Sequence, residues 1–320
     1  MEEVASERAL AWVRERNAET LTRLQSGDEY RRLRERILAI HDSVERVPRV
    51  VKHGAYYYNF WRDAEHPRGI LRRTDLDSYR TSAPLWEAIL DVDALAASEN
   101  ESWAFAGTVW LPPDYDRCLI RLSRGGADAV VTREFDIAAR TFVTDGFFIP
   151  ESKSIVDWID RDTLLVADNL DPESRTESGY PRVVKEWRRG TDLATAIPVL
   201  EGEKTDVRVM GQVDHAPGFE RIYLERHKTF FTSRLYLRHR GELREVEKPE
   251  DAEGFFFRDW FVIGLRSSWK VGSERFPAGS LVGAKLEDWL AGKADLRPLF
   301  QPTAGSSLTR IQQTRSHLLA

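Results

Sequence analysis

The sequence predicts an all-β fold of the propeller type over residues 48–320, preceded by a short helical segment at residues 1–47. Three observations lead to this prediction. Short apolar runs with a period of two, rich in Val, Ile, Phe, Tyr and Trp, begin near Val50 and are separated by turn residues. These runs recur in longer cycles of about 50 residues, which is the length of one four-stranded propeller blade. Finally, hairpins of the same kind recur from one cycle to the next.

The N-terminal segment shows a helical period over residues 6–43. Ser6 is a suitable N-cap, Gly27 a suitable end to the first helix, and Asp28 a suitable cap for a second helix. The predicted stripe of the first helix consists of Leu10, Val13, Asn17, Leu21 and Leu24. The predicted inner face of the second consists of Tyr30, Leu33, Ile37 and Ile40. Pro48 then ends the helical pattern.

The cycles of the β region are marked by strong strand starts. They lie near Tyr56, Trp103, Ile155, Val207, Phe255 and Leu308. Three hairpins are predicted within the cycles, and they pair 155–159 with 163–166, 234–237 with 242–244, and 255–257 with 260–263. A β-sandwich or two stacked sheets would also contain short strands and frequent turns. The long cycle favours the propeller, because a sandwich does not require it.

Composition limits the possible functions. The chain has 320 residues, of which 42% are hydrophobic and 31% charged, and this composition is that of a globular protein rather than a disordered one. A net charge of −5 with both signs interspersed argues against a nucleic-acid partner. No apolar run reaches the ~18 residues needed to span a membrane. The acidic N-terminus and the single cysteine, Cys118, lead us to expect a cytoplasmic location.

Serine nucleophiles of hydrolases sit in a G-x-S-x-G turn, which the sequence does not contain. The nearest string surrounds Ser280, where the flanking glycines are misplaced, and we expect a loop there. Ser123 precedes Gly125 and Gly126 in what we interpret as a hairpin turn. We therefore expect no catalytic residue in this chain.

Histidines are also candidates, because His215, His227 and His239 are spaced twelve residues apart. Metal-binding pairs sit two apart on a strand, or three or four apart on a helix. We therefore expect no metal site and interpret all three as solvated loop residues. No phosphate-binding loop is present, and we expect no cofactor.

Other conspicuous residues have structural interpretations. Asp157, Asp160 and Asp162 flank a tight turn that they are expected to stabilise, and Cys118 lies in an alternating strand and is expected in the core. Tryptophans recur at the blade period and are expected to pack between blades. They are Trp103, Trp110, Trp158, Trp187, Trp260, Trp269 and Trp289.

Several strings resemble the N-terminal half of the prolyl oligopeptidase family of serine peptidases. The clearest are 113–129 (PDYDRCLIRLSRGGADA) with 133–136 (REFD), 178–182 (SGYPR) with 187–191 (WRRGT), and 57–61 (YYNFW) with 66–69 (HPRG). The resemblance covers essentially the whole chain. It implies a seven-bladed propeller that restricts access of short peptides to an α/β-hydrolase domain carrying a Ser-Asp-His triad, with cleavage commonly after proline.

This sequence departs from the family pattern in extent. It holds about five blades, and residues 307–320 resemble the start of a sixth, so we expect an incomplete seven-bladed propeller without the catalytic half. The resemblance then implies a substrate-gating portion, inactive alone, whose residues 1–47 pack on the α/β-hydrolase domain in cis or as a separate chain. Two alternatives remain open, namely a stand-alone propeller acting as a binding or scaffold module and a closed five-bladed propeller with its own site.

Overall fold

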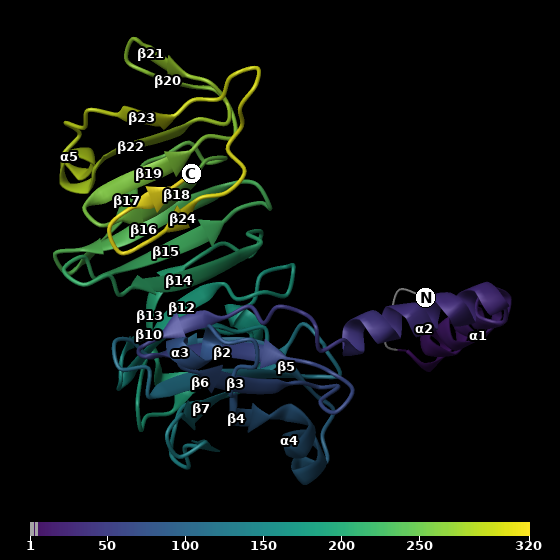
Figure 1. The fold of residues 1–320 in the computed structure, drawn as a ribbon. Helices are drawn as coiled ribbons and strands as arrows, with labels where there is room; N and C mark the ends of the chain where they lie inside the picture. The colour runs from purple at the N-terminus through teal and green to yellow at the C-terminus, as the bar shows by residue number, and fades with distance from the viewer. Residues whose placement is uncertain (1–2, 4–5) are drawn as a thin grey trace. The chain divides into compact units, whose positions relative to one another are not determined.

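The computed structural model describes residue 3 and residues 6–320, and it divides into two compact units, Met1–Glu101 and Ser102–Ala320. Within the described residues, the chain forms five sheets of four or five strands and two further two-stranded hairpins (Figure 1). Every strand pair in these sheets is antiparallel. No helix in this part of the chain is long and apolar enough to cross a membrane.

The first unit begins with the two predicted helices, α1 (Glu7–Leu24) and α2 (Asp28–Asp42). The Ser6 side chain accepts a hydrogen bond from the Ala9 amide, so the predicted N-cap is confirmed. The predicted cap of α2 is wrong, because Gly27 occupies the cap position and Asp28 is the first helical residue. The large aliphatic side chains of the two predicted faces are exposed in this chain. They are Leu10, Val13, Leu21, Leu24, Leu33, Ile37 and Ile40.

One sheet belongs to the first unit, and two short helices accompany it. Its strands, in spatial order, are β1 (Val51–His53), β2 (Tyr56–Trp61), β3 (Ile70–Thr74) and β4 (Glu87–Asp91), and the helices are α3 (Leu76–Tyr79) and α4 (Val92–Glu99). The Arg72 guanidinium lies 4.4 Å from the ring centre of Trp61 and 4.3 Å from that of Trp86. This aromatic environment buries the cation and lowers the pKa of Arg72 to about 10.

His53, the last residue of β1, lies beside the ring of Tyr58, and burial lowers the pKa of its imidazole from 6.5 to about 4. The unfolded chain therefore binds a proton between these pH values while the folded chain does not, so stability falls as the pH drops through 6.5 and levels off below about 4. In a nitrogen NMR titration, we expect the His53 ring to stay neutral down to about pH 4. Protonation of His53 at the midpoint of a blocked histidine peptide, titrated alongside, would contradict this expectation.

The second unit begins with two sheets. The first contains β5 (Trp103–Trp110), β6 (Arg117–Arg124), β7 (Val130–Asp136), β8 (Thr141–Phe142) and β9 (Phe148–Ser152), with β8 and β9 both paired to β7. The next, the β10–β13 sheet, contains β10 (Ile155–Asp160), β11 (Thr163–Ala167), β12 (Val183–Arg188) and β13 (Ile197–Glu201), with 3₁₀ turns at Pro172–Ser174 and Leu193–Thr195. The predicted hairpin of 155–159 with 163–166 is confirmed as β10–β11.

Two more sheets follow in chain order (Figure 1). The β14–β17 sheet contains β14 (Arg208–Asp214), β15 (Arg221–His227), β16 (Ser233–His239) and β17 (Glu242–Val246). The β18–β23 sheet contains β18 (Glu253–Phe257), β19 (Trp260–Gly264), β22 (Leu281–Lys285) and β23 (Arg297–Phe300), with α5 (Leu286–Leu290) after β22. The other two predicted hairpins are confirmed as β16–β17 and β18–β19.

Two hairpins lie outside these sheets. One, β20 (Trp269–Val271) with β21 (Glu274–Phe276), is inserted between β19 and β22, and the pattern of the sequence did not predict it. The other, β24 (Gln312–Gln313) with β25 (Leu318–Leu319), lies at the end of the chain. The strand predicted to start near Leu308 therefore begins four residues later, at Gln312.

The core explains why this is not a two-sheet sandwich. Leu164 and Val166 of β11 belong to one buried cluster with residues of the preceding sheet. These residues are Leu119 of β6 and Phe147, which directly precedes β9. On β11, Leu165 and Ala167 alternate with Leu164 and Val166 and face the opposite way. They join a second cluster with Val209 and Leu224 of the β14–β17 sheet. The β10–β13 sheet is thus covered on both faces by other sheets, as in a propeller, and the sandwich alternative is wrong.

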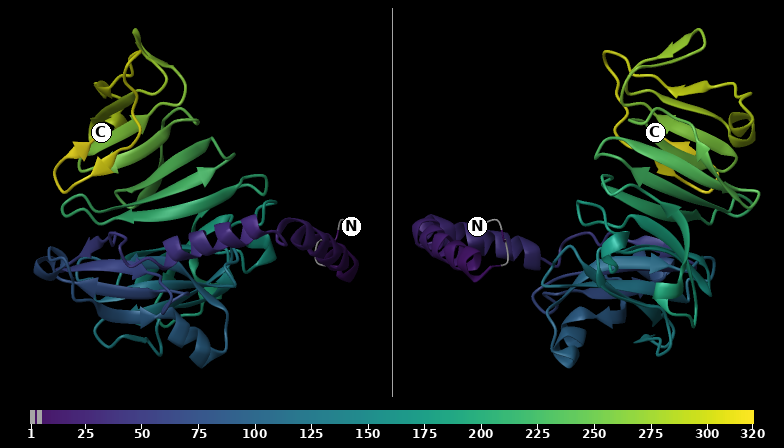
Figure 2. Two further views of the ribbon diagram at one scale, coloured as in Figure 1. Left: turned by 45° about the vertical axis from the view of Figure 1, so that its right-hand side comes forward. Right: turned by 180° about the vertical axis from the view of Figure 1, so that it is seen from behind.

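A close approach between two neighbouring sheets requires a glycine. Gly211 in β14 faces Leu165 of the β10–β13 sheet, and a Cβ atom at Gly211 would lie 2.3 Å from Leu165 Cδ2. Any larger residue would push β14 away from β11. A third cluster then joins Leu235 and Leu237 of β16 to the β18–β23 sheet, and the two sheets lie side by side in both views of Figure 2.

Candidate functional site

The two serines that we considered as nucleophiles both lie in the interior. Ser280 precedes β22 and is 1% exposed, and its Oγ has no hydrogen-bond partner among the described residues. Ser123 is 4% exposed and belongs to β6, where it pairs with Ala104. Its predicted place in a hairpin turn is wrong, because the strand continues to Arg124. In neither case does a histidine donate to or accept from the hydroxyl in the described structure.

Of the three evenly spaced histidines, His215 lies in a loop as predicted but is not fully solvated, and the loop prediction is wrong for the other two. His227 and His239 are the last residues of β15 and β16, and their side chains are 21% and 15% exposed. His215 is half-buried, and its Nε2 lies 2.9 Å from the Trp158 carbonyl oxygen. Among the residues that the structure describes, no group of three or more His, Cys, Asp or Glu is arranged to hold a metal ion.

The three aspartates near the β10–β11 turn have different roles. Asp160 accepts a hydrogen bond from the Asp162 amide and stabilises the turn, as predicted. Asp157 does not, because its Oδ2 accepts from the Val213 amide of β14 at 2.9 Å and so links two sheets. Burial raises the pKa of the Asp157 carboxyl. Cys118 is fully buried, as predicted, and burial raises the pKa of its thiol.

Two of the seven tryptophans, Trp158 and Trp187, pack in a cluster between neighbouring sheets, as predicted. Trp103, Trp158 and Trp187 are buried, and the Trp158 indole donates to the Val109 carbonyl of the neighbouring sheet at 3.0 Å. Phe147 makes edge contacts with both Trp158 and Trp187. The remaining four are half-buried, and they are Trp110, Trp260, Trp269 and Trp289.

A cavity of about 340 Å³ lies where β14 and β15 face the first residues of β18. We call it the inter-sheet cavity. Arg208 and His227 are directly opposite each other in the β14–β15 ladder, so their side chains share the face that lines it. The same holds for Met210 and Glu225, the next pair of the ladder on that face. The volume lies within the range of small-ligand sites, about 300–1,000 Å³.

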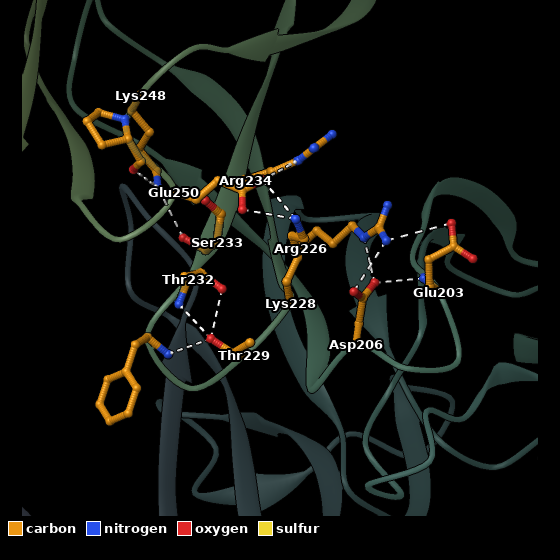
Figure 3. A network of polar contacts seen from close by, with 12 residues as sticks. Glu203, Asp206, Arg226, Lys228, Thr229, Thr232, Ser233, Arg234, Lys248 and Glu250 are labelled. Atoms are coloured by element: carbon orange, nitrogen blue, oxygen red, sulfur yellow. Dashed lines mark hydrogen bonds and ion pairs between the residues drawn. The ribbon is translucent and has the colours of Figure 1, made fainter.

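The rim of the inter-sheet cavity is the loop between β15 and β16. Phe230 and Phe231 lie at its tip with 85% and 67% of their surface exposed. The Thr229 hydroxyl oxygen accepts hydrogen bonds from the amides of Phe231 and Thr232, both at 3.1 Å. The Lys228 amide donates to the Thr232 carbonyl at 3.0 Å. These bonds, of which Figure 3 shows those of Thr229, hold the loop in a defined shape.

Ion pairs support the base of this loop (Figure 3). The Glu250 carboxylate accepts from Lys228 Nζ at 2.9 Å and from Arg234 Nε at 3.0 Å. These two cations lower the pKa of the Glu250 carboxyl. Lys248 Nζ donates to the carbonyl oxygens of Ser233 and Ala252, and burial lowers the pKa of its ammonium. The ends of β15, β16 and β18 are thereby tied together.

The sequence analysis did not identify this site. The only local signal was the string 228–232 (KTFFT), which places two aromatic residues in the turn between two alternating strands. Turn residues are ordinarily polar or glycine. An exposed aromatic pair at such a position is unusual and marks a candidate binding surface.

The comparisons with known proteins agree with the propeller-like packing of the sheets. Residues 1–241 match the model of the prolyl oligopeptidase N-terminal beta-propeller domain. An uncharacterized peptidase of Sinorhizobium fredii is 34% identical over 333 residues, which cover 100% of this chain and 46% of that protein. An uncharacterized peptidase of Rickettsia prowazekii is 30% identical over 338 residues, covering 99% of this chain and 46% of that protein. The chain thus spans about half the length of these relatives.

Solved structures show the same likeness. A post-proline cleaving enzyme from Rickettsia typhi superposes with a TM-score of 0.90 at 30% identity, over 98% of this chain and 48% of that chain. A prolyl endopeptidase superposes with a TM-score of 0.72 at 13% identity, over 98% of this chain and 44% of that chain. At 13% identity, the similarity to the prolyl endopeptidase shows a common fold and no more.

Proposed function

Because the chain belongs to the prolyl oligopeptidase family and is its propeller portion, we propose that it restricts access of substrates to a serine peptidase active site. The substrates are short peptides, cleaved commonly after proline. The observation that carries this proposal is the match of residues 1–241 to the family's propeller domain, together with the post-proline cleaving activity of the Rickettsia typhi relative. The Ser-Asp-His triad belongs to an α/β-hydrolase domain, and residues 1–320 act on peptides only in combination with it.

The complete ring in this proposal has seven blades. The five sheets of four or five strands within residues 51–300 supply five of them, and the β24–β25 hairpin begins a sixth. Each propeller blade packs on the next, so an open ring leaves an apolar face at its end. Support comes from a cavity lined mainly by apolar side chains beside the last sheet. They are Phe257, Trp260, Val262, Leu281, Leu299 and Leu318.

Residues 1–47 pack on the α/β-hydrolase domain, either in the same polypeptide or as a separate chain. The support is the set of large apolar side chains that are exposed on α1 and α2. An apolar surface of this kind is ordinarily covered by another domain or chain. Trp12 is 50% exposed, Leu24 64% and Ile40 59%. Burying such side chains contributes about 1.5–3 kcal/mol each. The assembled enzyme acts in the cytoplasm, which the single cysteine supports.

A peptidase assay tests the proposed function. The purified chain alone is expected to release no p-nitroaniline from a succinyl-Gly-Pro substrate. A chimera in which it replaces the matching portion of the Rickettsia typhi enzyme is expected to cleave that substrate and to spare a denatured protein of several hundred residues. Turnover by the chain alone, or equal cleavage of short and long substrates by the chimera, would refute the proposal.

Analytical ultracentrifugation distinguishes this proposed function from the alternative of a stand-alone binding or scaffold module. With apolar surface exposed on α1, α2 and beside the last sheet, the chain alone is expected to self-associate at micromolar concentration. A monodisperse monomer under these conditions would support the stand-alone module instead.

A further inference from the structure

Arg208 is an unpaired cation in the wall of the inter-sheet cavity. The residue is half-buried, and its Nε is inaccessible and has no hydrogen-bond partner. In the described part of the chain, no ion pair or hydrogen bond reaches its guanidinium. Leaving a buried charged donor unsatisfied costs more than a typical hydrogen bond contributes. This guanidinium therefore favours a ligand that brings an anion.

The other charged side chains lining the cavity include three carboxylates, and each lies beside a polar side chain. Glu225 Oε2 lies 3.3 Å from His227 Nε2 without a hydrogen bond between them, and Glu253 Oε1 lies 3.7 Å from the Arg266 guanidinium. Asp251 accepts a hydrogen bond from the Ser267 hydroxyl. Arg208 is the lining cation for which the described residues supply no counter-charge. A planar guanidinium with a free edge matches a carboxylate, because two parallel N–H···O bonds form at once.

The rim supplies the apolar half of the same site. Phe230 and Phe231 line the cavity together with Arg208, and the Arg266 guanidinium lies 5.2 Å from the ring centre of Phe231. The loop is held in shape by the Thr229 and Thr232 hydroxyls, so the rings lose little freedom when they are covered. A ligand that satisfies both halves has an apolar side chain next to a carboxylate.

We propose that the inter-sheet cavity binds the C-terminal residue of a peptide, with its α-carboxylate on Arg208 and its apolar side chain against Phe230 and Phe231. The inference rests on the proposed function in one respect, since it assigns to the propeller a second contact with the peptides that reach the active site. A site that recognises a free peptide end favours peptides over folded proteins whose C-terminus is covered.

Binding to the 320-residue chain itself tests this inference without any peptidase activity. By isothermal titration calorimetry, N-acetyl-Gly-Pro-Phe with a free carboxylate is expected to bind about tenfold or more tightly than its C-terminal amide, the factor for one charge-assisted hydrogen bond. Arg208→Met keeps the length of the side chain, and it should abolish this preference while leaving amide binding unchanged. The double change Phe230→Ser and Phe231→Ser should weaken both peptides equally.

A matched control is Arg244→Gln on β17 of the same sheet, whose side chain is exposed and which should bind like the wild type. Circular dichroism confirms that each variant is folded, and Arg208→Lys serves as a second variant that keeps the charge but loses the paired bonds. The inference is overturned if the wild type binds neither peptide or shows no preference for the free acid, or if Arg208→Met keeps that preference. Equal binding of N-acetyl-Gly-Glu-Phe-amide would also overturn it, because an internal carboxylate would then suffice.

The peptidase assay and the binding assay test the two proposals separately, so that one can be refuted without the other. Loss of binding in a chimera that still cleaves the proline substrate would refute only the role of the inter-sheet cavity. Binding by a chain whose chimera is inactive would refute only the gating function.

Discussion

Replacing Glu134 with alanine is expected to lower the free energy of unfolding by about 3–5 kcal/mol, the typical cost of removing one partner from a buried ion pair. The Glu134 side chain is 1% exposed. Its carboxylate accepts from Arg189 Nη1 at 2.7 Å and Nη2 at 3.1 Å, and from the Phe147 amide at 2.9 Å. Because Glu134 lies on β7 and Arg189 follows β12, the interaction joins two sheets. Its loss leaves the Arg189 guanidinium and the Phe147 amide without their buried acceptor.

The matched control is Asp162→Ala. Asp162 accepts from the same guanidinium, through Arg189 Nε at 2.9 Å, but its side chain is 69% exposed. An exposed ion pair contributes about 0–1 kcal/mol, so this variant should unfold almost like the wild type. Urea denaturation followed by circular dichroism measures both variants. Equal destabilisation by the two substitutions would show that burial does not determine the strength of the interaction.

Replacing Trp158 with alanine is expected to destabilise the second unit by about 3–5 kcal/mol, through lost burial and the cavity left behind. Trp158 is fully buried in the cluster between the β5 and β10–β13 sheets, and its indole donates to the Val109 carbonyl. Trp158→Phe retains most of the volume and loses the hydrogen bond, so its effect should be smaller. Chemical denaturation of both variants, monitored by far-ultraviolet circular dichroism, gives the comparison.

Trp12→Ala is the control for this series, because Trp12 is 50% exposed on α1. A change at an exposed site away from special features usually stays within about 0.5 kcal/mol. A destabilisation at Trp12 as large as that at Trp158 would mean that α1 is covered in the isolated chain, contrary to its exposed apolar side chains.

Much of the strand structure could be predicted from local patterns. Trp103 and Ile155 begin β5 and β10 where the apolar runs predict, and all three predicted hairpins are present. These predictions succeed because alternation and turn residues act over a few neighbouring positions. The inserted β20–β21 hairpin was missed, because strands of three residues carry too little alternation to stand out.

The candidate site was not predictable in the same way. Arg208 is one of many arginines in the sequence. Its unpaired state depends on the ladder that places it opposite His227 and on the charged residues around β18 and after β19 that line the same cavity. Asp157 shows the same limit, because it appeared to belong to a turn and in fact accepts from Val213 of another sheet. Such contacts join residues about 50 positions apart, and no local pattern records them.

The β-rich class, the roughly 50-residue cycle, the two N-terminal helices and the family of the chain could all be predicted from local patterns. Each of these follows from periodicity or from strings of neighbouring residues. The covered face of each strand, the partners of the charged groups and the exposure of Phe230 and Phe231 become visible in the folded chain and not before. The physical reason is that burial and ion pairing depend on distances between sheets, and packing sets these distances only after the strands have formed.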